Sequence, residues 1–348
     1  MKLISIVGAR PQFIKAAVIH RALKEYSEID EIIVHSGQHY DENMSDIFFK
    51  ELEISPPKYN LGVGSGKHGE QTAKMLSGFE ELFLLEKPDV CLVYGDTNST
   101  LAAALAAVKL HIPVAHVEAR LRSFNRHMPE EINRIATDHI SEWLFAPTST
   151  AMTLLENEGL KDKSYFVGDV MYDSAIFYSQ NNNPYMCAEG SYFLATVHRA
   201  ENTDSYERLT SICDAFNNIN TPIILPLHPR TRKYITEYGI KLKEHVKVID
   251  PVGYKEMIRL IEGSTKVLTD SGGLQKEAYF LKKQCITLRD ETEWVETLDH
   301  GWNTLVGASK SAILDAVSNH SLGSYINHYG DGNSGKHIIR RLLKSYNE

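Results

Sequence analysis

The chain has 348 residues, of which 43% are hydrophobic and 24% charged, a composition typical of globular proteins and a length sufficient for two domains. Its formal net charge of −8 lacks the basic surplus of nucleic-acid-binding proteins, so we expect no nucleic-acid partner. No apolar run approaches the roughly 20 residues of a membrane helix, and Arg10 and Pro11 interrupt the N-terminal run before a signal peptide is complete. The sequence therefore predicts a cytoplasmic protein without membrane contact.

The cysteines form neither a metal motif nor a redox motif. No two of them have the C-x-x-C spacing of a zinc ribbon or a thioredoxin-like site. We expect no metal site and four free, structural thiols, at Cys91, Cys187, Cys213 and Cys285.

In the first half of the chain, short apolar runs alternate with segments that carry apolar residues at helical spacing. The runs predict strands at 3–8, 31–36, 89–96, 113–119 and 142–148. The intervening segments predict helices at 11–26, 68–86, 98–110 and 149–158. This alternation indicates βαβ units, and therefore a parallel sheet covered by helices.

The same alternation restarts after a polar stretch at about 174–191. It predicts strands at 192–198, 222–228, 246–250, 266–270 and 284–288. We therefore predict an α/β fold of two doubly wound, Rossmann-like domains that face a cleft, at 1–168 and 169–333. A C-terminal helix within 334–348 is expected to pack back on the first domain. Ligands of such sheets bind beyond the carboxyl ends of the strands, so functional residues are expected just after them.

Polar residues follow the predicted strands of the first half. Arg10 and Lys15, about one turn apart at the start of a helix, indicate an anion between them, with a solvated arginine as the alternative. Asp96 follows the third strand and acts either in catalysis or only in a turn or cap. Glu118 closes an apolar strand, a setting that raises the proton affinity of a carboxylate.

The helix predicted to begin at Pro129 starts with Glu130 and Glu131. The helix dipole stabilises acidic residues at this end, which explains one of the two. It does not explain Asn133 or Arg134. With the two strand-end carboxylates, these acids can transfer protons on both faces of one carbon.

In the second half, His198 and Arg199 follow one predicted strand and His228 follows the next. Two histidine clusters at neighbouring strand ends favour a shared site over two unrelated structural histidines. We predict that all three residues belong to the site.

The segment TDSGGLQKEA at 269–278 predicts a strand, a tight turn and a helix. Ser271 offers a hydroxyl, and Gly272 and Gly273 let backbone N–H groups approach a diphosphate at the helix N-terminus. Glu277, in the second turn, can accept both hydroxyls of a ribose. A plain strand–helix turn is the alternative.

Two common nucleotide motifs do not fit this chain. GVGSGKHG at 62–69 lacks the glycine spacing of a phosphate loop and the Ser or Thr after its lysine, so we interpret it as a loop beside the ligand. No G-x-G-x-x-G turn follows the first strand, so no nicotinamide cofactor is indicated. We expect no cofactor.

In order and spacing, GARPQFIK, YGDTNST, HVEA-LRSFNRHMPEEINR, HRAEN and TDSGGLQKEA resemble the non-hydrolysing UDP-N-acetylglucosamine 2-epimerases over nearly the whole chain. The resemblance implies a GT-B-like fold, a homodimer, and neither a metal nor a redox cofactor. It also implies reversible anti-elimination of UDP through a 2-acetamidoglucal, with C2 inverted on re-addition, in the supply of surface polysaccharides.

The family's site residues match positions of this chain. Asp96, Glu118 and Glu130 match its catalytic carboxylates, and His198 matches its histidine near the diphosphate. We assign Arg134, Arg199 and His228 to substrate binding as well. The other implied binding residues are Arg10 and Lys15 for the diphosphate and sugar, Ser271, Gly272 and Gly273 for phosphate, Glu277 for ribose and Met257 for uracil.

Three features depart from the family pattern. Arg120 replaces a glycine beside Glu118, which implies either a distorted turn with lower activity or a contact between Arg120 and an acidic sugar. Trp294 stands where an arginine is expected near UDP. The run QHYD at 38–41, with a lysine and a histidine at 67–68, does not match the family's regulatory UDP-sugar site.

GARPQF, TEWVE and GWN are similar to a branch that includes epimerases of UDP-2,3-diacetamido-2,3-dideoxy-glucuronate, which is therefore an alternative to UDP-N-acetylglucosamine as substrate. Three other functions remain open: a GT-B glycosyltransferase, a nucleotide-sugar binder without catalysis, and a hydrolysing epimerase. Deuterium entering C2 from solvent separates them, because a transferase or a binder leaves that carbon untouched. A hydrolysing enzyme accumulates UDP and free sugar.

Overall fold

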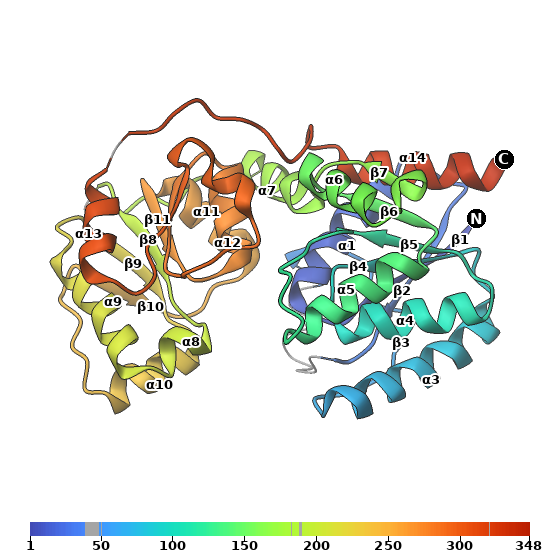
Figure 1. The fold of residues 1–348 in the computed structure, drawn as a ribbon, viewed down its shortest axis with the longest axis horizontal. Helices are drawn as coiled ribbons and strands as arrows, with labels where there is room; N and C mark the ends of the chain where they lie inside the picture. The colour runs from blue at the N-terminus through green and yellow to red at the C-terminus, as the bar shows by residue number, and fades with distance from the viewer. Residues whose placement is uncertain (39–48, 50, 182, 188–189, 320) are drawn as a thin grey trace. The chain divides into compact units, whose positions relative to one another are not determined.

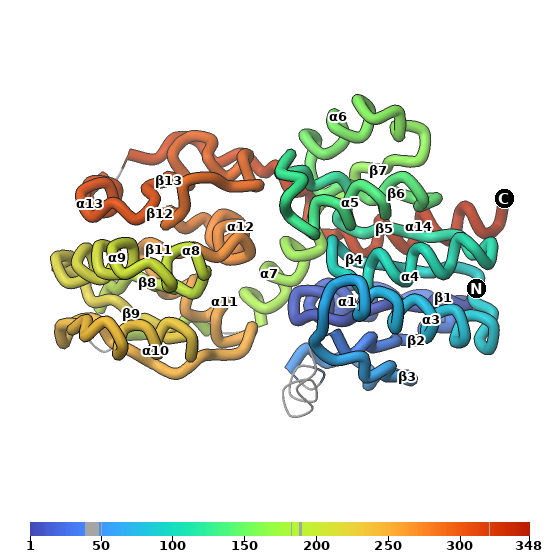
Figure 2. Tube along the Cα trace, turned by 60° about the horizontal axis from the view of Figure 1, so that its bottom comes forward, coloured from blue at the N-terminus to red at the C-terminus, as the bar shows by residue number. Residues whose placement is uncertain are grey.

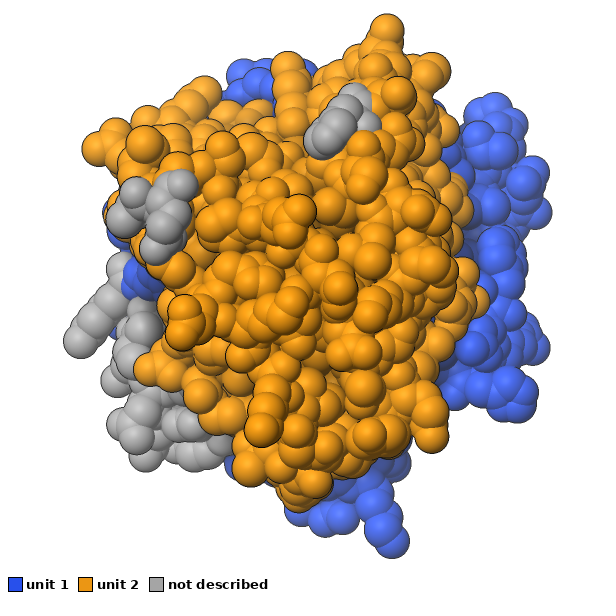
Figure 3. Space-filling view, turned by 90° about the vertical axis from the view of Figure 1, so that its left-hand side faces the viewer, with its two compact units in different colours: residues 1–174, 328–348 blue, residues 175–327 orange. Residues whose placement is uncertain are grey.

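The computed structural model describes residues 1–38, 49, 51–181, 183–187, 190–319 and 321–348 (Figure 1). The chain divides into two compact units, coloured in Figure 3. Unit 1 comprises Met1–Ser174 and His328–Glu348, and unit 2 comprises Ala175–Asn327. Helix α7 (Val170–Gln180) contains the boundary between them.

The described part of unit 1 contains a seven-stranded parallel sheet in the order β3-β2-β1-β4-β5-β6-β7. Its strands are β1 (Lys2–Val7), β2 (Asp30–His35), β3 (Tyr59–Asn60), β4 (Val90–Tyr94), β5 (Val114–Val117), β6 (Trp143–Ala146) and β7 (Ser164–Phe166). Its helices include α1 (Arg10–Leu23), α3 (His68–Glu86), α4 (Asn98–Lys109), α5 (Pro129–Ile140), α6 (Ser149–Asn157) and α14 (Ser334–Asn347), with a 3₁₀ turn η1 (Lys161–Lys163).

Helices cover both faces of this sheet. In Figures 1 and 2, α3, α4 and α5 lie side by side on one face, and α1 and α14 pack together on the other. Gly335 of α14 lies so close to α1 that a Cβ there would come within 2.9 Å of Val18. Strands buried on both faces are apolar throughout, as in β4, whose five residues are all buried.

Unit 2 contains, in its described residues, a six-stranded parallel sheet in the order β10-β9-β8-β11-β12-β13. Its strands are β8 (Phe193–Thr196), β9 (Ile223–Pro226), β10 (Val246–Ile249), β11 (Lys266–Thr269), β12 (Gln284–Thr287) and β13 (Asn303–Leu305). Its helices include α8 (Ala200–Thr203), α9 (Tyr206–Asn218), α10 (Pro229–Glu237), α11 (Tyr254–Gly263), α12 (Gly272–Phe280) and α13 (Lys310–Ser318), with a 3₁₀ segment η2 (Val295–Gly301).

The predicted class of two doubly wound α/β sheets is confirmed. Each predicted strand is present, with bounds that differ by one or two residues: β1 and β2 begin one residue earlier than predicted, and every strand ends one or two residues earlier. The predicted helix at 68–86 has those bounds as α3. The sequence did not indicate β3, β7 or β13, because two or three residues are too few to show a pattern. None of the helices in the described ranges is long and apolar enough to cross a membrane.

The strand order of each sheet reverses at one point, between β1 and β4 in unit 1 and between β8 and β11 in unit 2. Doubly wound sheets bind ligands beyond the carboxyl ends of the strands at this switch point. In unit 1 the turns at that place carry Arg10 and Asp96. In unit 2 they carry His198 and Ser271.

Candidate active site

The switch point of unit 1 holds a buried ion pair. Lys15 Nζ lies 2.7 Å from Glu118 Oε1, and each side chain is only 8% exposed. The pair lies under Gly95, where a Cβ would come within 3.3 Å of Lys15 Nζ and where φ is +62°, so a glycine is favoured. The sequence predicted apolar surroundings for Glu118, and this prediction is wrong, since Lys15 from α1 lies beside its carboxylate. A buried carboxylate is normally paired with a cation in this way.

Asp96 is held by a second ion pair. Its Oδ2 accepts a hydrogen bond from Arg134 Nε at 2.9 Å and lies 2.7 Å from Arg134 Nη2. Asn133 donates to the Asp96 carbonyl oxygen at 2.9 Å. Asn133 and Arg134, which the helix dipole left unexplained, therefore hold the turn that carries Asp96.

The two acids at the start of α5 have different environments. Glu131 is buried and accepts hydrogen bonds from Ser123 N at 2.9 Å, Phe124 N at 3.2 Å and Arg134 Nη1 at 2.9 Å. Glu130 is partly exposed and makes no hydrogen bond or ion pair with the residues that the structure describes. Glu131 therefore holds the 118–124 segment in place, whereas the Glu130 side chain is partly open to solvent.

The segment after β5 has an unusual backbone. Glu118, Arg120 and Phe124 have φ values of +65°, +66° and +58°, in the left-handed region that favours glycine. Each such residue costs about 1–2 kcal/mol relative to a right-handed conformation. Arg120 therefore occupies a position suited to the glycine of the family pattern, and its guanidinium pairs with Glu158.

Gln12 connects the turn after β1 with the end of β4, a role that was not predicted from the sequence. Its Oε1 accepts hydrogen bonds from Gly8 N and Ala9 N at 2.8 and 3.0 Å, and its Nε2 donates to the Tyr94 carbonyl oxygen at 2.8 Å. The sequence does place the Gln12 amide in the first turn of the helix after β1, and this position could have indicated the role. Arg10, one residue into the same turn, is exposed at the start of α1.

In unit 2, Asp270 organises the turn after β8. This wholly buried carboxylate accepts hydrogen bonds from His198 N at 3.1 Å and Arg199 N at 3.0 Å. Burial lowers the pKa of His198 below its usual value, which favours the neutral imidazole. His228 caps α10, and its ring centroid lies 6.0 Å from that of His198. The structure thus brings these two predicted histidines together.

As predicted, a tight turn at Ser271 connects β11 with the start of α12. Ser271 caps it by accepting a hydrogen bond from Leu274 N at 3.4 Å. A Cβ at Gly272 would lie 2.6 Å from Glu293 Oε1, whereas at Gly273 it would meet only Ser271 Oγ, at 4.0 Å. The space beside Gly272 is therefore filled by the protein, and the space beside Gly273 is open.

Trp294 lies beside this turn in place of the expected arginine. It is 5% exposed, its Nε1 would be 3.4 Å from a Cβ at Gly272, and Lys276 Nζ lies 3.8 Å from its ring centre. Lys276, on α12 itself, thus places a positive charge over the indole ring of Trp294. Of the other predicted binding residues, Glu277 is buried on α12 and Met257 is half-buried on α11.

Most of the run compared with a regulatory site lies outside the described residues. Gln38 is described, and its Oε1 accepts hydrogen bonds from Ser99 N and Oγ at 3.0 and 2.7 Å. His68, at the start of α3, lies 3.1 Å from Asn98 Nδ2. Within the described part of the chain, no group of three or more His, Cys, Asp or Glu side chains is arranged to hold a metal ion.

The chain is similar to known proteins over nearly its whole length. Residues 21–343 match the family model described as UDP-N-acetylglucosamine 2-epimerase. The chain is 54% identical to a UDP-N-acetylglucosamine 2-epimerase homolog of Methanococcus maripaludis, over 98% of this chain and 99% of that protein. It is 53% identical to the UDP-2,3-diacetamido-2,3-dideoxy-D-glucuronate 2-epimerase of Pseudomonas aeruginosa, over 99% and 100%. The crystal structure of Methanocaldococcus jannaschii UDP-GlcNAc 2-epimerase with UDP-GlcNAc and UDP matches with a TM-score of 0.88 and 47% identity, over 99% and 100% of the two chains.

Two doubly wound sheets, with charged residues gathered at both switch points, define a nucleotide-sugar enzyme of GT-B-like fold. The chain belongs to the UDP-N-acetylglucosamine 2-epimerase family, a family of isomerases. The resemblance inferred from its motifs is confirmed.

Proposed function

We propose that the protein inverts C2 of a UDP-linked N-acetylamino sugar by eliminating UDP and adding it back. The observation that carries this proposal is the group of carboxylates in unit 1. Asp96 and Glu118 each face a cation from another element, and Glu130 is unpaired among the described residues. Acids in this arrangement suit proton transfer.

The proposed reaction conserves atoms and electrons. A carboxylate takes the C2 proton, the C–H electrons form the C1=C2 bond of a 2-acetamidoglucal, and the C1–O bond to UDP breaks. A proton then reaches the opposite face of C2 while a phosphate oxygen of UDP re-forms its bond to C1. Asp96, Glu118 and Glu130 are the proposed proton carriers, and His198 is proposed to act near the departing diphosphate.

Unit 2 is proposed to hold UDP. Phosphate would contact the capped N-terminus of α12, where aligned N–H groups and an open face at Gly273 support an anion. The remaining assignments are Arg199 and His228 near the diphosphate, Glu277 at the ribose, Met257 at the uracil, and, from unit 1, Arg10, Lys15 and Arg134 at the diphosphate and sugar.

We propose UDP-N-acetylglucosamine as the substrate, converted to UDP-N-acetylmannosamine for surface polysaccharides in the cytoplasm. UDP-2,3-diacetamido-2,3-dideoxy-glucuronate is the second candidate, because the Pseudomonas aeruginosa relative is named as the 2-epimerase of that sugar. Incubating the enzyme with each UDP-sugar in deuterated water, followed by NMR, tests both. Deuterium at C2 of only one sugar identifies the substrate, and none at C2 of either contradicts the proposal.

A homodimer is also proposed, on the strength of the family resemblance. Light scattering of the purified protein at micromolar concentration is expected to give twice the chain mass of 39.3 kDa. A monomer mass at all concentrations would contradict this part of the proposal.

A further inference from the structure

A buried ionic network lies behind the candidate carboxylates, with Asp138 of α5 at its centre. Asp138 is wholly buried, and its Oδ1 lies 2.8 Å from His116 Nδ1. Its Oδ2 accepts hydrogen bonds from Arg122 Nη2 at 2.6 Å and from Arg120 N at 3.3 Å. Although burial opposes ionisation, His116 and Arg122 hold the pKa of Asp138 below its ordinary value.

The first arm of the network reaches the turn that carries Asp96. His116, wholly buried on β5, has Nε2 2.7 Å from the carbonyl oxygen of Gly95 and Nδ1 facing Asp138. Both ring nitrogens thus face acceptors. Gly95 directly precedes Asp96 and lies against the Lys15–Glu118 pair. The contact of His116 with the Gly95 carbonyl oxygen therefore holds the turn that carries Asp96.

The second arm reaches the segment that carries Glu118. Asp138 binds the backbone N–H of Arg120, which has a left-handed conformation, and the side chain of Arg122. Arg122 also donates to Glu158 at 3.0 Å. Left-handed residues other than glycine persist where the surrounding structure holds them in place, and this network does so here.

We propose that Asp138 is a positioning residue that holds both turns of the site, presenting Asp96 through His116 and Glu118 through the Arg120 backbone. This inference rests on the proposed function and deepens it. Misplacing catalytic groups by about 1 Å can cost about 100-fold in rate even when the mutated residue lies away from the chemistry.

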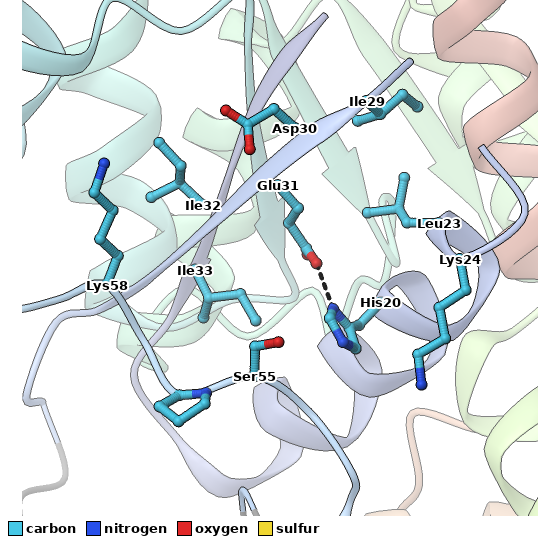
Figure 4. A pocket seen from close by; sticks show the side chains of 11 residues that line it. His20, Leu23, Lys24, Ile29, Asp30, Glu31, Ile32, Ile33, Ser55 and Lys58 are labelled. Atoms are coloured by element: carbon cyan, nitrogen blue, oxygen red, sulfur yellow. Dashed lines mark hydrogen bonds and ion pairs between the residues drawn. The ribbon is translucent and has the colours of Figure 1, made fainter. Parts of the chain in front are cut away.

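The variants are Asp138→Asn, His116→Ala and His116→Gln. A glutamine amide can still donate to the Gly95 carbonyl oxygen, whereas alanine cannot. The matched control is His20→Ala, which removes a histidine from another ion pair of unit 1, His20 Nδ1 to Glu31 Oε2 at 2.7 Å (Figure 4). The pocket around this pair is lined by none of the candidate site residues.

We expect Asp138→Asn and His116→Ala to lower kcat for C2 exchange by up to about 100-fold, with UDP affinity within about twofold of wild type. His116→Gln should recover at least part of the activity lost in His116→Ala, and His20→Ala should keep wild-type kcat. Unchanged kcat in folded Asp138→Asn, or equal losses in Asp138→Asn and His20→Ala, would overturn the proposal. If Asp138→Asn does not fold, the same comparison holds with His116→Ala and His116→Gln, and equal activity of those two would overturn it.

Amide hydrogen exchange supplies a readout that does not need activity. Peptides covering residues 94–100 and 117–125 should both lose protection in Asp138→Asn and keep it in His20→Ala. If the wild type shows no C2 exchange, the proposed function fails, and these peptides still test the positioning role. Unchanged protection of both peptides in Asp138→Asn would overturn it.

Discussion

Arg120 carries a long side chain where the backbone favours glycine. Its guanidinium pairs with Glu158, so an acidic sugar would have to compete with a carboxylate already in place. We therefore expect Arg120→Gly to change kcat/KM for the neutral and the glucuronate sugar by the same factor, within about twofold. Relief of strain, worth about 1 kcal/mol, opposes the loss of this buried ion pair in the free energy of unfolding, and Arg122 still pairs with Glu158 in the variant.

Steady-state kinetics with both UDP-sugars checks this expectation. A loss confined to the glucuronate sugar would show instead that Arg120 binds the substrate.

The three candidate carboxylates should respond differently to conversion into amides. Each change is expected to reduce C2 exchange by roughly 10²–10⁴, because the amide lacks a basic oxygen. Glu130→Gln should leave the melting temperature unchanged, since Glu130 has no partner among the described residues. Glu118→Gln should destabilise unit 1 by about 3–5 kcal/mol, because Lys15 stays buried without its counter-ion.

Calorimetry with single-turnover exchange measures both effects. The double variant Lys15→Met with Glu118→Gln is the control, and it should regain most of the lost stability while remaining inactive. Near-normal exchange in all three amide variants would rule out proton transfer by these groups.

At the residue level, the sequence shows which charged side chains follow strands. It indicates little about what those side chains contact. Asp96 and Glu118 are recognisable because β4 and β5 are apolar runs with clear ends. The contact between Lys15 and Glu118 spans about 100 positions and depends on the strand order. His116 and Asp138 lie inside a strand and a helix, where a buried polar residue gives no strand-end signal.

At the scale of single elements, the N-terminus of α12 separates two kinds of glycine. Gly273→Val should leave the melting temperature near that of wild type and weaken UDP binding at least tenfold, because its open face would be filled. Gly272→Val should displace the Glu293 carboxylate, whose Oε1 would lie 2.6 Å from the new Cβ, and lower stability only by what is lost of the Arg289–Glu293 ion pair. Titration calorimetry and thermal melting read the two effects, and UDP affinity unchanged in Gly273→Val would exclude phosphate from this turn.

The end of α3 is tied to the sheet edge by Glu86, which binds Lys58 Nζ at 2.7 Å and Lys2 Nζ at 3.3 Å. Hydrogen bonds, first from Lys58 and then from Tyr59, lower the pKa of Glu86 to about 2. A carboxyl whose pKa falls on folding adds stability above its unfolded value of 4.5, and that stability is lost as the pH drops from 4.5 towards 2.

We expect Glu86→Gln to be less stable than wild type by about 1–2 kcal/mol at pH 7 and to differ little at pH 2.5. Urea unfolding at both pH values measures this difference. A gap that stays constant between them would contradict the assigned pKa.

The element pattern was largely predictable because both sheets are parallel and buried on both faces. Such strands are continuous apolar runs, and the helices between them have a clear period. β7 and β13 escaped prediction because they are three-residue edge strands. The order of the strands follows from packing between distant segments, which no local pattern records.

At the scale of the whole molecule, each unit is a doubly wound sheet with its own switch point. Unit 1 gathers carboxylates and cations there, and unit 2 gathers histidines and a capped, glycine-led helix. A glycosyltransferase needs the nucleotide-binding residues of unit 2, whereas inversion of a C–H centre also needs the carboxylates and cations of unit 1. The chemistry proposed for the chain therefore depends on unit 1.

The most direct measurement of that chemistry is isotope uptake at C2 of the substrate. The enzyme is incubated with a UDP-N-acetylamino sugar in deuterated water, and NMR and mass spectrometry follow both epimers. The account predicts one deuterium at C2 of each epimer, formation of the C2-inverted UDP-sugar, and no accumulation of free sugar with UDP. A C2 position that keeps its proton while the nucleotide sugar binds would contradict it.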